Sequence, residues 1–232
     1  ETKKLVEENA VKMQIGFNRR FDHNFRKIKK LRDDGTLGEI QIIRITSRDP
    51  EPPSPEYAKT SGGMFLDMTI HDFDMACYQA NSEVDEVYAM GAVTVDPEIG
   101  KAGDIDTAIV TLKFKNGAMA VIDNCRKAVY GYDQRVEVFG TNGAAASEND
   151  RETMVKISSK DAVCEDKPLF FFLERYMQSF RDEIKSFINA ILNDRPVEVN
   201  IDDGLRPILI AIAANKSMKE NRPVKISEVM EG

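Results

Sequence analysis

Residues 108–123 read AIVTLKFKNGAMAVID, and this stretch decides the fold that the sequence predicts. Apolar and polar residues alternate along its first half, and the apolar face carries Ala108, Val110, Leu112 and Phe114. A period of two is the spacing of a β-strand with one buried face. Asn116 and Gly117 then give the strongest short hairpin signal, because this pair forms the two-residue turn that matches the twist of paired strands. We therefore predict an antiparallel pair that returns through Ala118 to Asp123.

Segments on both sides of this hairpin extend the pattern. Further strands are predicted at 39–46, 83–95, 135–139 and 144–148, and residues 11–17 also have strand character. Helices are predicted at 24–31, from Ser61 through Tyr78, at 177–191, and after residues 201–204 to about Glu220. Because strands group in the middle and helices towards the ends, we predict an α+β fold, a mostly antiparallel open β-sheet with helices on one face.

Composition excludes several classes of protein. The chain has 232 residues, 42% of them hydrophobic and 31% charged, and no apolar run approaches the length of about 18 that suggests a membrane span. The net charge of -7 repels phosphate backbones, so nucleic acid is not an expected partner. The cysteines, Cys77, Cys125 and Cys164, include no C-x-x-C pair, and we expect a reducing, cytoplasmic location.

Asp67, His71 and Asp74 form the most distinctive constellation in the sequence. At four- and three-residue spacing on one helix they share a face, which puts an imidazole between two carboxylates. Such a histidine can act as a general base near neutral pH. The spacing alone is equally that of a polar helix face with a surface histidine. A divalent metal site is a further interpretation, which the presence of only one other histidine, His23, disfavours.

Other segments leave two interpretations open. Ser61 to Gly63 could bind an anion or simply cap a helix, and the basic run 26–32 fits a solvated helix face. Asn18 to Asp22 and Tyr130 to Arg135 place polar groups at predicted strand ends, where a polyol could bind. No G-x-G-x-x-G or Walker motif occurs in the 232 residues, so the usual nucleotide-binding loops are not expected in this chain.

Four segments together resemble a known family. They are IGFNRRFD at 15–22, GGMFLDMTIHDFD at 62–74, YGYDQR at 130–135 and KPLFFFLERY at 167–176. In this order they closely resemble the inositol 2-dehydrogenases of the glucose-fructose oxidoreductase-like (Gfo/Idh/MocA) family of NAD(P)-dependent dehydrogenases. Members of that family join an N-terminal Rossmann domain to an α+β domain. The resemblance implies that residues 1–17 are a remnant of the Rossmann domain, otherwise absent here, and that 18–232 form the C-terminal substrate-binding and oligomerisation domain.

The resemblance also implies roles for individual residues. His71 would be the catalytic base and Asp67 would orient it, while Arg19, Asp49, Asp74 and Tyr132 would contact the polyol. The family's catalytic lysine, in a Glu-Lys-Pro motif, would lie upstream of residue 1. Some inositol dehydrogenases show His and Asn near Ser47 and Asp49, which makes the substrate less defined than the family.

The expected reaction is NAD-dependent (or NADP-dependent) oxidation of a cyclic polyol, foremost myo-inositol to 2-keto-myo-inositol, or of another sugar or cyclitol. The cofactor belongs to the full-length protein, and this part alone is expected to bind none and to be inactive. The expected assembly is a homo-oligomer, a dimer or tetramer, formed through the sheet. The alternatives are a non-catalytic interaction domain and a metal-dependent lyase or isomerase.

Overall fold

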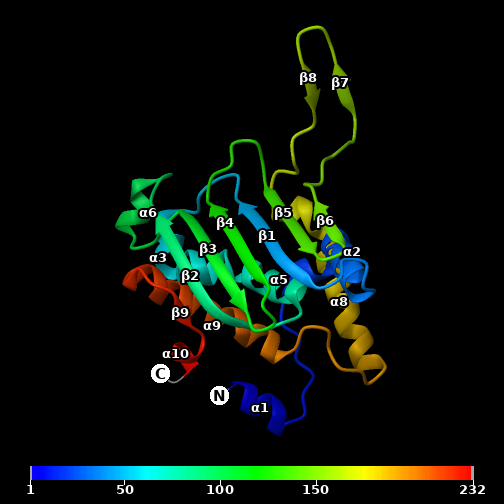
Figure 1. The fold of residues 1–232 in the computed structure, drawn as a ribbon, viewed down its shortest axis with the longest axis vertical. Coiled ribbons are helices and arrows are strands. Elements are labelled where there is room, and N and C mark those ends of the chain that lie inside the picture. Colours follow the sequence, from blue (N-terminus) through cyan, green and yellow to red (C-terminus); the bar gives the residue numbers. More distant parts are fainter. Residues whose placement is uncertain (1, 231–232) are drawn as a thin grey trace.

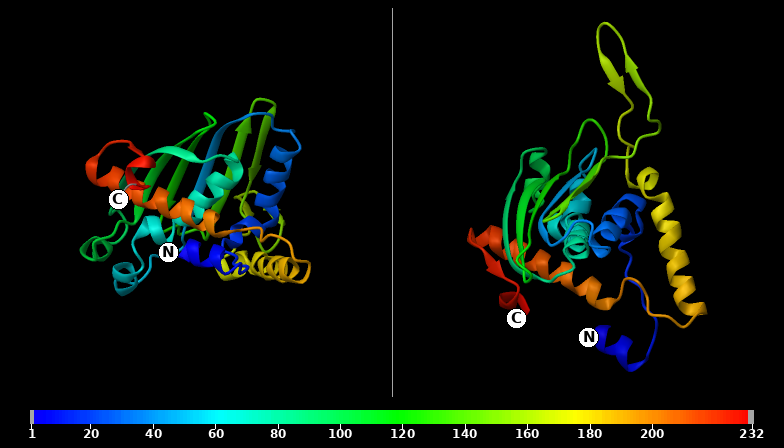
Figure 2. Two further views of the ribbon diagram at one scale, coloured as in Figure 1. Left: turned by 90° about the horizontal axis from the view of Figure 1, so that it is seen from below. Right: turned by 45° about the vertical axis from the view of Figure 1, so that its right-hand side comes forward.

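The computed structural model describes residues 2–230, and its centre is a seven-stranded sheet with helices on one face (Figures 1 and 2). The strands are β1 (Ile40–Arg48), β2 (Val84–Ala92), β3 (Thr107–Phe114), β4 (Met119–Cys125), β5 (Asp133–Gly140), β6 (Gly143–Ser147) and β9 (Val224–Lys225). They lie in the order β6-β5-β1-β4-β3-β2-β9. The predicted α+β class is confirmed.

The helices occupy the two ends of the chain and the segment between β1 and β2. They are α1 (Thr2–Glu8), the 3-10 helix η1 (Asn18–Phe21), α2 (His23–Asp33), α3 (Pro55–Thr60), α4 (Met64–Asp67), α5 (Ile70–Ala80), α6 (Pro97–Lys101), α7 (Phe172–Arg175), α8 (Met177–Leu192), α9 (Ile201–Glu220) and α10 (Ser227–Met230). Across residues 2–230, no helix has both the length and the apolar character needed to cross a bilayer.

The hairpin predicted from residues 108–123 forms as β3 and β4. Val110 lies opposite Ile122 and Leu112 opposite Ala120, and Gly117 takes a positive φ of 91° in the turn. Strand β1 enters beside β4 as the one parallel pair of the main sheet, and its other neighbour β5 is antiparallel. This parallel pair was not apparent from the sequence, because alternation within a strand says nothing about which strand lies next to it.

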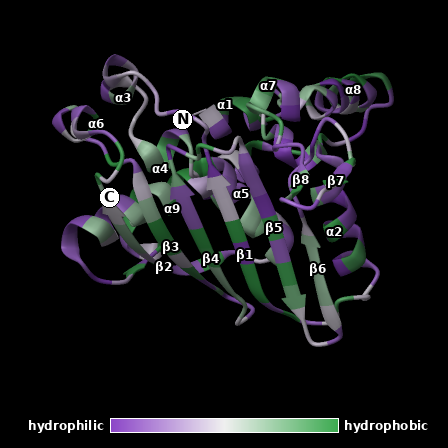
Figure 3. Ribbon diagram, turned by 90° about the horizontal axis from the view of Figure 1, so that it is seen from above, coloured by the Kyte–Doolittle hydropathy of each residue, from purple (hydrophilic) through white to green (hydrophobic). Residues whose placement is uncertain are grey.

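The core lies between the sheet and helices α5 and α9. Side chains that are completely buried include Val87, Val110, Ile122 and Val138 from the strands and Phe73 and Ala76 from α5. Helix α9 presents Ala211, Ala213 and Ala214, also completely buried, to this interior. The opposite face of the sheet is not covered by any described helix, and its apolar residues stand among polar ones (Figure 3).

Two predictions about local structure are wrong. Residues 11–17 form no strand, and their backbone bond to a distant segment is the one from the Ile15 N–H to the Val199 carbonyl. The helix predicted from Ser61 is broken: Gly62 and Gly63 have positive φ values of 90° and 84° and precede α4, which ends at Asp67. Helix α5 then begins at Ile70, so Asp67 and His71 do not follow one continuous helical stripe.

An arm that the sequence did not predict projects from the body after β6. It is a two-stranded hairpin of β7 (Lys156–Ser158) and β8 (Val163–Glu165), and Figure 1 shows it standing clear of the main sheet. Every residue of its two strands is exposed. Three-residue strands are too short to show a periodic pattern, which explains why the sequence concealed them.

Candidate active site

A cavity of about 330 Å³ opens where η1, the end of β1, the junction of α4 and α5, and helices α7 and α8 meet. It is lined by Gly16, Asn18, Arg19, Asp49, Asp67, Met68, His71, Tyr132, Phe171, Phe172, Tyr176 and Phe180. Five of the six site residues expected from the sequence, all except Asp74, therefore meet at one place. The volume is at the lower end of the range for small-molecule sites, which suits one sugar-sized ligand.

His71 is the first-turn residue of α5 that faces the cavity. Its ring meets Phe17 edge-on, with 5.8 Å between centroids, and the Nδ1 atom is buried without a hydrogen-bond partner. Burial, with a smaller contribution from the Arg19 charge, lowers the pKa of His71 to about 3. The imidazole is therefore neutral at pH 7 and has a free lone pair to accept a proton.

The carboxylate of Asp67 is held by two other side chains. Its Oδ1 accepts a hydrogen bond of 2.7 Å from the Tyr57 hydroxyl, and its Oδ2 accepts one of 3.0 Å from Nη2 of Arg126. No hydrogen bond joins Asp67 to His71 among the described residues. The predicted arrangement, an imidazole clamped by the carboxylates on both sides of it, is thus not what the structure contains, because the helix breaks between the two residues.

Arg19 and Asp49 place opposite charges on the cavity wall. Arg19 is 6% exposed and donates through Nη1 to Asp72, at 2.6 Å, and through both Nη atoms to the Ser47 hydroxyl. Asp49 follows β1, and burial raises the pKa of its carboxyl to about 6 against the opposing effects of Arg126 and Arg19. These groups offer both hydrogen-bond donors and acceptors to a ligand with hydroxyl groups.

Aromatic rings form the wall opposite the charged groups. Tyr132 packs edge-on against Phe171 and Tyr176, with centroids 5.4 and 6.0 Å apart. The Arg19 guanidinium lies 5.9 Å from the centre of the Tyr176 ring. Burial raises the pKa of Tyr176 to about 12, so its hydroxyl stays protonated. Apolar rings beside directed polar groups are typical of sites for cyclic ligands that have both apolar faces and hydroxyl edges.

Asp74 lies outside the cavity. It is 1% exposed, and Arg20 donates to it from Nε, at 3.0 Å to each oxygen, and from Nη2 at 2.6 Å. Arg20 also reaches Asp203 at the start of α9. The three-residue spacing from His71 pointed to a shared face, but the buried arginine takes both oxygens of this carboxylate and leaves none to a ligand in the cavity.

Two alternative sites suggested by the sequence are already satisfied by side chains of the protein itself. The N–H of Met64, which follows Gly63, donates to Oδ1 of Asp104, so this helix start is capped by a carboxylate. Within residues 2–230, three potential metal ligands converge at Asp22, His23 and Asp150. The side chain of Arg175 pairs with both of these aspartates and already supplies a cation to the cluster.

Several residues of the site carried no sequence signal of their own. Asp72, Asn124 and Arg126 are each at most 2% exposed and connect helix α5 or Asp67 to the ends of strands β3 and β4. Asn124 and Arg126 follow the hairpin directly, where a polar cluster was visible without a partner. Only the crossing of α5 over the sheet brings their partners to them.

Comparison with known proteins places the chain in a family. Residues 25–146 match the family model of the GFO/IDH/MocA C-terminal domain. The chain is 55% identical over 221 residues to an uncharacterized oxidoreductase, YrbE, of Bacillus subtilis, covering 95% of this chain and 65% of that protein. It is 51% identical over 230 residues to the myo-inositol 2-dehydrogenase of Thermotoga maritima, covering 98% and 69%. The chain thus spans about two thirds of the length of these relatives.

A solved structure shares the fold. The scyllo-inositol dehydrogenase of Lactobacillus casei, with bound NAD(H) and scyllo-inositol, superposes with a TM-score of 0.89 at 31% identity, covering 97% of this chain and 68% of that one. The shared fold, the matched domain and the relatives above half identity agree with one another. The chain belongs to the GFO/IDH/MocA family of dehydrogenases.

Proposed function

We propose that this chain forms the substrate site of an NAD-dependent dehydrogenase that oxidises one secondary hydroxyl of a cyclic polyol, foremost myo-inositol. The observation that carries the proposal is the single cavity in which Arg19, Asp49, Asp67, His71 and Tyr132 meet. The names of the relatives support the substrate class, since one is a myo-inositol 2-dehydrogenase and another was solved with scyllo-inositol.

His71 is the proton acceptor in this proposal. Oxidation of a secondary alcohol removes a proton from the hydroxyl and a hydride from the carbon that bears it. The neutral imidazole takes the proton, and the low pKa that burial imposes makes it release that proton readily after the ketone forms. The Asp67 carboxylate, fixed by Tyr57 and Arg126, supplies negative charge at the same cavity while His71 is protonated.

Arg19, Asp49 and Tyr132 bind and orient the ring of the polyol. Arg19 donates to hydroxyl oxygens, and Asp49 accepts from hydroxyl hydrogens. The Tyr132 ring, buried to all but 6%, covers the apolar face of the ligand. Together these contacts hold one carbon and its hydroxyl near His71, which is the orientation that the chemistry requires.

NAD supplies hydride acceptance in dehydrogenases of this kind. The described residues do not themselves fit a dinucleotide: the glycine pair at 62–63 leads into a helix start whose N–H group is taken by Asp104, and the cavity is sized for a single ring. The contribution proposed for residues 2–230 is therefore to bind the polyol and to accept its proton.

The test is NADH formation from myo-inositol and NAD by the protein in its natural full length. His71→Ala is expected to lower kcat by about 10²- to 10⁴-fold, the effect of losing a general base. His23→Ala is the matched control, because His23 is exposed on α2 and does not line the cavity. Full activity of the His71 variant, or no wild-type activity with inositols, would contradict the proposal.

We also propose that two copies associate through the open face of the sheet. Four apolar side chains on it are between 44% and 54% exposed, namely Met90, Ile109, Met119 and Phe139. Charges of both signs, such as Arg44 and Glu137, stand among them. A face of this composition is complementary to its own copy related by a two-fold axis.

A further inference from the structure

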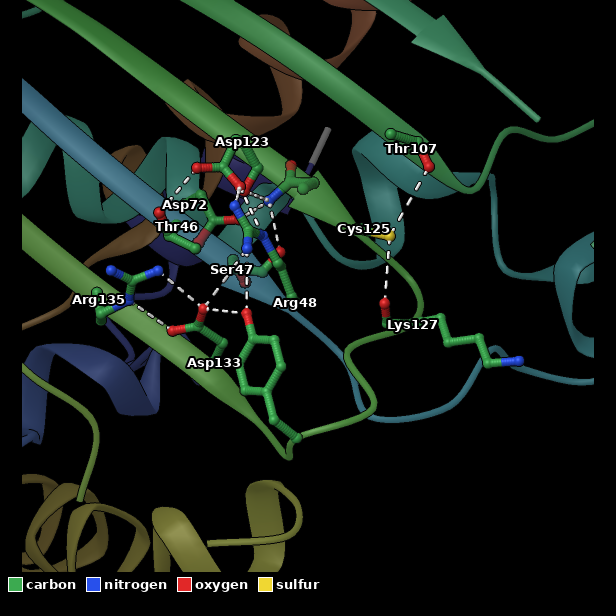
Figure 4. A network of polar contacts seen from close by, with 12 residues as sticks. Thr46, Ser47, Arg48, Asp72, Thr107, Asp123, Cys125, Lys127, Asp133 and Arg135 are labelled. Carbon is green, nitrogen blue, oxygen red and sulfur yellow. Dashed lines mark hydrogen bonds and ion pairs between the residues drawn. The ribbon is translucent and has the colours of Figure 1, made fainter. Parts of the chain in front are cut away.

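Asp72 follows His71 along the chain but does not line the cavity. Its side chain is completely buried between α5 and the sheet, and Figure 4 shows it beside the strands near Ser47. Oδ1 accepts a hydrogen bond of 2.6 Å from Nη1 of Arg19, and Oδ2 accepts one of 2.8 Å from Nδ2 of Asn124. Asp72 thus lies directly behind the arginine of the site.

The sheet holds this pair in place. Asn124 on β4 accepts a hydrogen bond of 2.7 Å from the Thr69 hydroxyl and also donates to the Ser47 carbonyl. The Ser47 hydroxyl on β1 accepts from Arg19 and donates to Oε1 of Gln134 on β5 at 3.0 Å. Three adjacent strands therefore fix the carboxylate and the guanidinium, and such connected buried networks are rigid.

Arg19 is the one cation among the described residues that line the cavity, where Asp49 and Asp67 are also present. Without a partner behind it, the guanidinium would be an uncompensated buried charge and would turn towards one of these carboxylates. A new pair of that kind would occupy the space and the hydrogen-bonding groups that a polyol needs. The position of Arg19 is therefore decided by a residue that never touches the ligand.

We propose that Asp72 is a positioning residue, which holds Arg19 against the cavity wall so that its guanidinium binds the polyol and does not pair with Asp49 or Asp67. This inference rests on the proposed function, because it assigns Arg19 to binding of the polyol. It adds to that function a specific cause for the geometry of the site: the aspartate after His71 acts on binding of the substrate through an arginine 53 residues away in sequence.

The experiment is steady-state kinetics of Asp72→Asn with myo-inositol and NAD. The KM for myo-inositol is expected to rise about 10- to 100-fold, the range for loss of a charge-assisted hydrogen bond, with kcat within about threefold and the KM for NAD unchanged. Asp22→Asn is the control: Asp22 is also completely buried and paired with an arginine, Arg175, and asparagine retains its capping role at α2. Its KM for inositol should equal that of the wild type.

A double mutant separates positioning from general destabilisation. If Asp72 acts through Arg19, then Arg19→Met with Asp72→Asn raises KM no further than Arg19→Met alone. Additive effects, or an unchanged KM in Asp72→Asn, overturn the inference while wild-type turnover of inositol leaves the proposed function standing. Absence of wild-type turnover overturns both.

A milder variant covers the case in which Asp72→Asn does not fold. Ser47→Ala removes only the hydroxyl that accepts from Arg19 at 3.4 and 3.5 Å. The KM for myo-inositol is then expected to rise about threefold with kcat unchanged, the effect of one neutral hydrogen bond. A Ser47→Ala enzyme with the wild-type KM overturns the inference.

Discussion

Neighbouring residues at the ends of β1 and β4 build two polar networks on opposite faces of one sheet (Figure 4). On the covered face, Ser47 and Asn124 belong to the network around Asp72 and Arg19, where every side chain is at most 6% exposed. On the open face, Arg48 pairs with Asp123 at 2.6 Å, with a third or more of each side chain exposed.

The same kinds of residue therefore have different value on the two faces. Water and salt screen the open-face pair, and such pairs contribute little to stability. A buried pair costs much more to break, because the remaining partner is left as an unpaired charge in a medium of low dielectric constant. The covered face, not the visible one, determines where the groups of the candidate site stand. Three predictions test this difference.

The largest effect is expected from Asp74→Ala. This change leaves Arg20, whose side chain is 11% exposed, with Asp203 as its remaining partner, and should lower the free energy of unfolding by about 3–5 kcal/mol. Asp123→Ala on the open face should lower it by less than about 1 kcal/mol. Urea unfolding of both variants at pH 7 measures the two values, and equal losses would remove the distinction between the faces.

A second effect should appear with pH at Asp49. Because burial raises the pKa of this carboxyl from 3.8 to about 6, the folded chain binds the proton more tightly than the unfolded chain. The stability this provides is present below about pH 4 and is lost as the pH rises through 6, a change of about 3 kcal/mol. Asp49→Asn lacks the titration, so its stability relative to the wild type should increase over this range.

Asp34 provides the control for the sign. Its exposed carboxylate accepts hydrogen bonds from the side chain and backbone of Thr36, which lower its pKa. Its contribution is therefore present at higher pH and lost as the pH falls, opposite to that of Asp49. Denaturant unfolding of Asp49→Asn, Asp34→Asn and the wild type between pH 3.5 and 7 distinguishes them. A difference at Asp49 that does not vary with pH would show that burial does not perturb this group.

The smallest effect on folding is expected from Met119→Glu on the open face. Met119 is 54% exposed, so the unfolding free energy should change by no more than about 0.5 kcal/mol. Self-association should nevertheless be lost, because two such faces would bring like charges together. Sedimentation or light scattering gives the mass, with Ile184→Glu on α8, 61% exposed and away from the sheet, as control. Unchanged mass in the Met119 variant would exclude this face as the interface.

Periodic segments were predictable because their pattern is local. The alternation in 108–123, with its Asn-Gly turn, identified β3 and β4 and the face each buries. The three- and four-residue repeat at 177–191 likewise identified α8. The break between α4 and α5 was not predictable, because Thr69 stands between the helices with its hydroxyl bound to Asn124, 55 residues further along. Long-range bonds of this kind override helical preference and have no local signature.

The sequence by itself determined the fold class, the family and the residue types available for chemistry, because side-chain period and ordered motifs are properties of the chain alone. Only the tertiary structure decided how those residues are used. Asp72 and Asp74 are two positions apart on one helix, yet one supports Arg19 at the cavity and the other is closed off by Arg20. The physical reason is burial: a charge removed from water must find a partner, and the fold alone decides which partner is within reach.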